Sequence, residues 1–293
     1  MSADGLIVVD KPAGMTSHDV VARIRRLAKT RRVGHGGTLD PMATGVLIIG
    51  VNRATRLLTY VIGAEKSYAA TVRLGQSTIT DDAEGEVTAT AGVDGVTAEA
   101  IHAGLDAQRG EIDQVPSAVS AIKINGQRAY KRVREGEEVT LPARRVTISR
   151  LDVLDIRRGD GVIDVDIEVT CTSGTYIRAI ARDLGVALGS GGHLTALRRT
   201  AVGALTLDDA ATLEELEQRA PDVVALPMSE AARQAFPQRT ATEEEARVLS
   251  HGGPLTPVGI EGPYAVFAPS GEVLAIVSER EGRARAEIVL APA

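Results

Sequence analysis

A glycine- and proline-rich segment, residues 34–45, is followed at once by the apolar run 46–49. Five of its twelve residues are Gly or Pro, so its backbone can approach another molecule closely. The apolar run is typical of a buried strand. Asp40 precedes Pro41, which favours an extended backbone at Asp40. The pattern predicts a carboxylate at the rim of a core, beside a loop that carries His35. An ordinary Asp-Pro turn with a surface histidine is the alternative.

Hydrophobic periodicity divides the chain into the strands and helices of an α+β protein. Alternating or continuous apolar residues indicate strands, and apolar residues three and four positions apart indicate helices. Thr16 or Ser17 can cap the first helix. We expect strands at 6–9, 46–49, 68–74, 146–156, 162–171, 264–268, 273–278 and 284–290, and helices at 17–28, 53–58, 177–184, 212–235 and from 243. The change from helices to short strands predicts a domain boundary near 228–240.

The cysteine and histidine content excludes several classes of site. Cys171 is the only cysteine, so an internal disulfide framework and a cysteine-rich zinc site are excluded. The five histidines have no metal-ligand spacing, and no phosphate-binding loop, dinucleotide motif or nucleophile elbow occurs. We therefore expect no metal and no nucleotide cofactor. Because the sequence has no signal peptide and no apolar run of roughly 18 residues, we expect a cytoplasmic protein without a membrane partner.

The charge is unevenly distributed along the chain. The net charge is −6, but residues 1–200 hold 26 Lys and Arg against 24 Asp and Glu, whereas residues 201–293 hold 7 against 15. Basic residues cluster within 23–32 and 123–145. Such clusters can guide RNA or DNA into a groove even in an acidic protein, although solvated helix faces are an equal alternative. Residues 240–293 hold 4 basic and 8 acidic residues, which argues against a main part in RNA binding.

Six segments carry a resemblance to a known family. They are residues 10–17, 34–47, 66–68, 115–130, 173–178 and 192–199. Segment 34–47 resembles the catalytic motif of bacterial tRNA pseudouridine-55 synthases, which are B-type pseudouridine synthases. The other five resemble further motifs of that family, in the same order and at matching spacing over about residues 5–205. The resemblance adds a specific chemical meaning to Asp40 that the Asp-Pro pair alone does not have.

The resemblance implies an α+β pseudouridine-synthase fold with a mixed, mostly antiparallel central sheet flanked by helices. It implies a catalytic domain over 1–230, a thumb loop at about 115–140, and a small β-rich, PUA-like domain over 240–293. The implied reaction breaks the N1–C1′ bond of uridine 55 in the TΨC loop of tRNA, turns the base and rejoins it through C5. It needs neither a metal nor a cofactor. The implied partner is the TΨC stem-loop, and we expect a monomer with no obligatory protein partner.

The resemblance also implies roles for individual residues. Asp40 acts as a nucleophile on C1′ or C6 or assists deprotonation, and Arg178 holds this carboxylate ionised and oriented. Tyr68 packs on the target base and can take a proton from C2′. The base is flipped out of its stack, and His35 fills the space that it leaves. Tyr176 and Leu197 line the uracil pocket.

The roles also have structural alternatives. Tyr176 and Leu197 could be ordinary core residues. Arg182 is interpreted as part of a solvated helix face, and the acidic segment 81–86 as a solvated loop. Tyr130, in the thumb, either grips RNA or anchors that loop. The residues assigned to RNA positioning are Lys11, Arg23, Arg26, Lys123 and Arg132. For Lys11, a part in positioning the backbone is also expected, because it lies in the opening motif.

Two rival functions follow from the same residues. The first is a pseudouridine synthase of this fold that acts on another RNA or within a guide-RNA particle. Long basic extensions at the termini would favour the particle, and this sequence has no such extensions. The second is an RNA-binding or RNA-folding protein in which Asp40 is only structural. The second rival predicts that Asp40→Asn leaves the useful activity intact.

Overall fold

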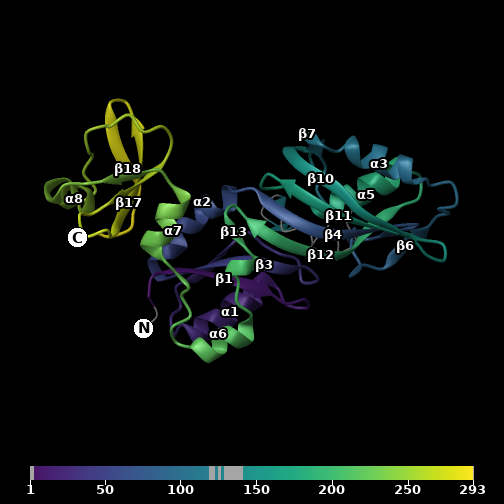
Figure 1. Cartoon of the computed structure of the whole chain (residues 1–293), viewed down its shortest axis with the longest axis horizontal. Helices are drawn as coiled ribbons and strands as arrows, with labels where there is room; N and C mark the ends of the chain where they lie inside the picture. Colours follow the sequence, from purple (N-terminus) through teal and green to yellow (C-terminus); the bar gives the residue numbers. More distant parts are fainter. Residues whose placement is uncertain (1–2, 119–122, 125–126, 129–140, 293) are drawn as a thin grey trace.

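The computed structural model describes residues 3–118, 123–124, 127–128 and 141–292, and its centre is one large twisted sheet (Figure 1). The sheet has ten strands in the order β14-β1-β3-β12-β4-β11-β10-β7, with β2 beside β3 and β13 beside β12. The pairing of β3 with β12 is parallel, whereas the other named pairs are antiparallel. The expected mixed, mostly antiparallel sheet is confirmed.

The bounds of these strands are β1 Gly5–Lys11, β2 Val33–Gly36, β3 Thr44–Val51, β4 Lys66–Leu74, β7 Gly110–Gln114, β10 Arg144–Arg158, β11 Ile163–Cys171, β12 Gly192–Val202, β13 Leu205–Thr206 and β14 Leu226–Pro227. Two small hairpins join β5 (Gln76–Thr78) to β6 (Val87–Thr90) and β8 (Lys123–Ile124) to β9 (Gln127–Arg128). The helices around the sheet are α1 Ser17–Leu27, η1 Asn52–Leu57, α2 Leu58–Gly63, α3 Ala98–Asp106, α5 Ile177–Ala187, η2 Leu207–Asp209, α6 Leu213–Arg219 and α7 Met228–Ala235.

Strands β1 and β3 separate two hydrophobic cores because successive side chains of a strand point to opposite faces. Ile7 and Val9 of β1 belong to the core that α1, α5 and α6 cover. Leu6 and Val8 belong to a second core that α2 and α7 cover. The continuous apolar run of β3 is thus buried on both faces, which explains its lack of alternation.

The C-terminal part is a four-stranded sheet of β15 (Gln238–Thr240), β16 (Tyr264–Phe267), β17 (Val273–Arg280) and β18 (Arg283–Val289), with α8 (Glu243–Ser250) beside it. Ala265, Phe267 and Ile276 belong to the second core, so this sheet contributes to the same apolar cluster as β1 and β3. Arg53 of η1 also reaches it, since its guanidinium donates to the Leu290 carbonyl at 3.1 Å. The expected small β-rich C-terminal region is confirmed.

The expected helix over 212–235 is wrong, whereas the other expected strands and helices are present with shifted ends. Helix α6 ends at Arg219, because Pro221 disfavours helical backbone at the residue before it. The chain then forms β14, which pairs with β1, and Pro227 caps the separate helix α7. Two prolines within the apolar pattern therefore divide one expected helix into two.

Gly45 lies opposite Arg199 where β3 pairs with the parallel strand β12. Its φ is +95°, and a Cβ there would lie 2.2 Å from the carbonyl oxygen of Arg199 on β12. Gly14 has a similar φ of +80° but no heavy atom within 4 Å of its ideal Cβ position.

We expect Gly14→Ala to lower the free energy of unfolding by about 1–2 kcal/mol through backbone strain alone. Gly45→Ala should cost at least about 3 kcal/mol because of the added collision. Urea unfolding of both variants measures the difference, and equal losses would show that the close approach is not a constraint.

Candidate active site

A cavity of about 240 Å³ lies where four remote segments meet at the sheet. The loop between β2 and β3 contributes Asp40, β4 contributes Tyr68, and β12 contributes Leu197. The turn before α5, together with its first residues, contributes Tyr176 and Arg178. The structure thus brings together five residues that the sequence singles out. Lys66 and Arg199 complete a lining in which three cationic side chains and one carboxylate face the same space.

The loop that carries Asp40 is held by a buried ammonium group. Lys11 at the end of β1 is fully buried, and its Nζ donates to the carbonyls of Pro12 (2.8 Å), Pro41 (3.2 Å) and Ala43 (2.6 Å). Burial lowers the pKa of Lys11 to about 8. Because its three hydrogens are directed at backbone carbonyls, Lys11 does not face an RNA phosphate. Its assignment to RNA positioning is therefore wrong, and it positions the loop backbone instead.

The start of α1 holds the same loop from the other side. Thr16 caps the helix, and its side chain accepts from the Asp19 N–H at 3.1 Å. The Ser17 hydroxyl accepts from the Leu39 N–H (2.9 Å) and donates to the Leu39 carbonyl (3.1 Å). Thr16 is thus the cap, whereas Ser17 fixes the residue before Asp40.

Arg178 lies between two carboxylates at the cavity. Its Nε is 3.1 Å from Oδ2 of Asp40, and its Nη1 is 3.2 Å from Oδ2 of Asp82. The Arg178 and Asp82 side chains are 6% and 3% exposed, whereas that of Asp40 is 37% exposed and lines the cavity. The pKa of Asp40 is raised above its ordinary value, mainly by burial and further by the Asp82 charge, and the Arg178 charge offsets this only in part. The arrangement makes Asp40 the accessible member of a buried charge trio.

The acidic segment 81–86 is only in part the solvated loop that the sequence suggests, since Glu84 and Glu86 are exposed whereas the two aspartates are not. Asp82 is buried, and its carboxylate also accepts from the Thr80 hydroxyl and the Glu84 N–H. Asp81 pairs with Arg182 at 3.3 Å, and Arg182 also donates to the Val115 carbonyl at 2.7 Å. The interpretation of Arg182 as part of a solvated face is therefore wrong as well. Sequence reasoning missed Asp82 because its cationic partner lies 96 residues away.

Arg199 is a second residue that sequence reasoning missed. It is 1% exposed, and its guanidinium donates to the carbonyls of Val46 (2.7 Å) and Gly37 (3.1 Å). Burial raises the pKa of the Tyr68 phenol, and the Arg199 charge partly offsets this. The available signal was spacing, since Arg199 lies two positions after Leu197 on one strand and therefore on the same face.

Gln114 fixes the turn that carries Tyr176. The Gln114 side chain accepts from the Tyr176 N–H at 2.8 Å and donates to the Tyr176 carbonyl at 3.1 Å. Tyr176 is the N-terminal cap residue of α5, and its own side chain makes no capping bond. This two-point contact sets the start of the helix, and Arg178 follows two residues later. Gln114 is buried at the end of β7, outside the motif that begins at Val115.

The remaining predicted residues lie away from the cavity lining. His35 is on β2, with its ring edge-on to that of His18 at a centroid distance of 5.3 Å. Burial lowers the pKa of His35. Arg23 on α1 forms an ion pair with Glu217 on α6, whereas Arg26 is exposed. Lys123 lies in β8, but its side chain, Arg132 and Tyr130 are outside the described residues, as is most of the expected thumb loop.

The described residues contain neither a metal-binding cluster of side chains nor a helix that could span a membrane. Among the residues that the structure describes, no group of three or more His, Cys, Asp or Glu side chains is arranged to hold a metal ion. No helix in the described ranges is both long and apolar enough to cross a membrane.

The chain is similar to pseudouridine synthases over nearly its whole length. Residues 25–177 match the family model "TruB family pseudouridylate synthase (N terminal domain)", residues 178–226 match "tRNA pseudouridylate synthase B C-terminal domain", and residues 236–291 match "tRNA Pseudouridine synthase II, C terminal". It is 57% identical to the tRNA pseudouridine synthase B of Arthrobacter sp. (strain FB24), and the match covers 98% of this chain and 97% of that protein. The enzyme of the same name from Thermobifida fusca (strain YX) is 56% identical, with 99% of each chain covered.

The fold is also similar to that of a solved structure. A chain in the "Crystal structure of the archaeal box H/ACA sRNP Nop10-Cbf5 complex" superposes with a TM-score of 0.71 at 27% identity. The match covers 98% of this chain and 86% of that one. The central sheet and the C-terminal sheet described above are therefore shared with a structurally characterised protein.

The charge trio predicts opposite changes in the Asp40 pKa for its two other members. Asp82→Asn removes a like charge, so the pKa of Asp40 should fall. Arg178→Met removes the opposite charge, so the pKa of Asp40 should rise. A titration of the Asp40 carboxyl carbon by NMR measures both. Asp164→Asn is the matched control, since Asp164 pairs with Arg73 and should leave the Asp40 pKa unchanged. Shifts of the same sign in both variants would contradict the electrostatic account.

Proposed function

Because the chain belongs to the TruB family of pseudouridylate synthases, we propose that its target is uridine 55 in the TΨC loop of tRNA, with Asp40 as the essential carboxylate. The chain is an enzyme that isomerises a tRNA uridine to pseudouridine. The position in tRNA and the role of Asp40 are the steps that we add. The accessible Asp40 carboxylate, held beside the buried Arg178 guanidinium at the cavity, supports the role of Asp40, and membership of the TruB family supports the position in tRNA.

The isomerisation breaks the N1–C1′ bond of uridine and forms a C5–C1′ bond; C5 loses a proton and N1 takes one up, so the composition of the nucleotide is unchanged. Asp40 must be ionised to attack C1′ or C6, and Arg178 favours that form while it fixes one carboxylate oxygen. Tyr68 faces the same cavity, so it can pack on the base and accept the C2′ proton if the reaction takes that route. No electron or group leaves the substrate, so these residues supply acid–base and nucleophilic chemistry only.

The size and position of the cavity favour a single flipped base. Its volume of about 240 Å³ is below the roughly 300–1,000 Å³ of clefts that take drug-sized ligands. A uridine in a folded loop must leave its stack to reach Asp40, at a cost of a few kcal/mol. Tyr176 and Leu197 would contact the base in this cavity. His35, outside the lining, would fill the space that the base leaves in the RNA.

The wider assignments are proposals of the same kind. Arg23, Arg26, Lys123 and Arg132 would position the RNA through its phosphates, which carry no sequence information. We propose a monomeric enzyme of the cytoplasm that needs no protein partner. We also propose a catalytic domain over 1–230 and a second domain over 240–293.

Tritium release from a tRNA transcript with [5-³H]uridine tests this function directly. The reaction is run with EDTA and without an added cofactor, because the proposed chemistry needs neither. We expect release from the wild-type protein, and a loss of at least about 10³-fold with Asp40→Asn, which keeps the side-chain shape but removes the nucleophilic charge. A transcript with cytidine at position 55 should give no release.

The controls separate this function from its rivals. Asp164→Asn removes a carboxylate remote from the cavity and should release tritium at the wild-type rate. Release that does not depend on U55 would move the target to another position or RNA. Full activity of Asp40→Asn would overturn the catalytic role of Asp40 and favour an RNA-binding or RNA-folding function.

A further inference from the structure

Four exposed cations cover the C-terminal end of α1 and the turn after it. Arg26 lies in the last turn of the helix, and Lys29, Arg31 and Arg32 lie between the helix and β2. Among the described residues, none of the four has a carboxylate within ion-pair distance, whereas Arg23 earlier in the helix pairs with Glu217. We call Arg26, Lys29, Arg31 and Arg32 the α1 basic patch.

Helix stabilisation explains only one member of this patch. A cation in the last turn interacts favourably with the helix dipole, and Arg26 occupies that place. Lys29, Arg31 and Arg32 lie beyond the helix, where that effect falls off. In a chain with a net charge of −6, four such cations within seven positions form a local positive field. Such a field attracts a polyanion.

The backbone under the patch is fixed by hydrogen bonds. The Thr30 N–H donates to the Arg25 carbonyl at 3.2 Å, and the Thr30 hydroxyl donates to the Asn52 side chain at 2.8 Å. The Asn52 N–H in turn donates to the Arg32 carbonyl at 2.7 Å. The turn is thus held against η1, so the four cations start from fixed backbone positions and binding need not order that backbone.

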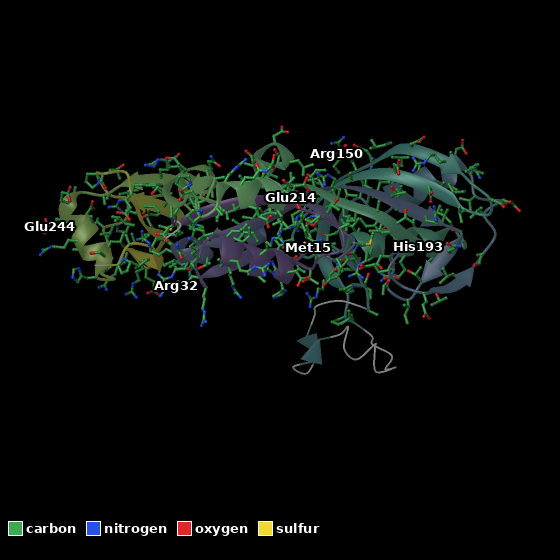
Figure 2. All side chains as sticks on the ribbon, turned by 90° about the horizontal axis from the view of Figure 1, so that it is seen from below. Met15, Arg32, Arg150, His193, Glu214 and Glu244 are labelled. Atoms are coloured by element: carbon green, nitrogen blue, oxygen red, sulfur yellow. The ribbon has the colours of Figure 1, made fainter. Side chains whose placement is uncertain are left out.

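Helix α1 connects the patch to the active site. Ser17 at one end of α1 holds Leu39, next to Asp40, and the patch lies at the other end. Eleven residues at 1.5 Å each make the helix about 16 Å long. Figure 2 shows Arg32 on the lower edge of the molecule and Arg150 on the opposite edge. The patch therefore lies on one side of the molecule, about a helix length from the catalytic loop.

We propose that the α1 basic patch binds the phosphates of the double-stranded stem that continues from the target loop. The inference rests on the proposed function, which places the target nucleotide at Asp40. The length of α1 separates the patch from Ser17, which holds Leu39 beside Asp40, so the patch would meet phosphates outside the flipped nucleotide. The contacts are electrostatic, so they position any stem regardless of its sequence.

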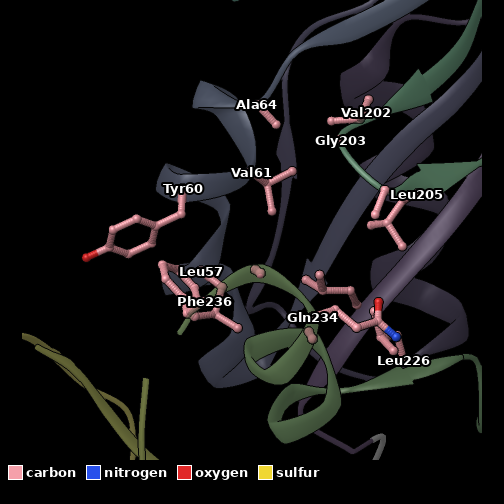
Figure 3. A pocket seen from close by; sticks show the side chains of 14 residues that line it. Leu57, Tyr60, Val61, Ala64, Val202, Gly203, Leu205, Leu226, Gln234 and Phe236 are labelled. Carbon is pink, nitrogen blue, oxygen red and sulfur yellow. The ribbon is translucent and has the colours of Figure 1, made fainter. Parts of the chain in front are cut away.

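The apolar cavity of about 270 Å³ between α2, β13 and α7 is a weaker candidate for a binding site (Figure 3). Tyr60, Val61, Leu205 and Phe236 line it, and it opens beside the second core. Apolar residues dominate its lining. Among the described residues, no charged side chain lines it, so nothing in the lining selects a class of ligand.

Equilibrium binding of two RNAs at several salt concentrations tests the patch. One RNA is a full tRNA, and the other is the target loop closed by only a few base pairs. The double variant Arg31→Gln/Arg32→Gln removes two exposed cations. The matched control is Arg150→Gln/Arg157→Gln, which removes two cations from β10 and changes the net charge equally.

Arg31→Gln/Arg32→Gln should weaken the binding of full tRNA about tenfold near 0.1 M salt. The slope of log Kd against log salt should also fall by about two, because the variant neutralises two fewer phosphates. The same variant should bind the short hairpin as tightly as the wild type does. The single-turnover rate at saturating tRNA should also stay at the wild-type value, because the patch does not touch the cavity. The control variant should bind both RNAs like wild type.

Two results would overturn the proposal. Equal weakening of tRNA binding by the two double variants would reveal an effect of net charge alone. Unchanged tRNA binding by Arg31→Gln/Arg32→Gln would mean that the patch does not bind RNA, and an acidic protein surface would then be its partner. Failure of the proposed function gives a different result, since the wild type would then form no pseudouridine at position 55 of tRNA. The comparison of the two double variants still decides whether the patch binds the stem.

Discussion

The guanidinium of Arg178 lies between two carboxylates, and the chemistry of the site depends on this shared contact. Without a cation between them, Asp40 and Asp82 would be like charges side by side, and both burial and the Asp82 charge raise the pKa of Asp40. Removing one member of a buried ion pair costs several kcal/mol because the other charge is left uncompensated. Arg178 therefore stabilises the charge of Asp40, and Asp82 in turn keeps the Arg178 guanidinium in place.

The sheet order brings these groups together from distant parts of the chain. Strand β12 lies between β3 and β4, so the loop before β3 and the side chains of β4 and β12 surround one cavity. Two buried cations complete the scaffold: Lys11 binds the carbonyls of the Asp40 loop, and Arg199 binds the carbonyls at its start. The Asp40 carboxylate thus stands on a loop whose backbone is fixed at both ends.

Sequence patterns predict the parts of this protein that local rules control. Alternation and apolar runs locate the strands, and the Gly- and Pro-rich loop before β3 locates Asp40. Long-range pairing is what the patterns miss. Asp82 and Arg182 resemble solvated charges in sequence, because their partners are separated from them by about a hundred residues. The burial of Lys11 is likewise invisible until the loop that it holds is folded against β1.

The central claim is that ionised Asp40, held by Arg178, carries out the isomerisation. The most direct test is the pH dependence of the single-turnover rate at saturating tRNA, for the wild type and for Arg178→Lys. Only the ionised carboxylate reacts, so the rate should fall as the pH decreases through the Asp40 pKa. Lysine keeps the charge but loses the paired geometry, so the acidic limb should move to higher pH. An acidic limb at the same pH in both proteins would contradict the account.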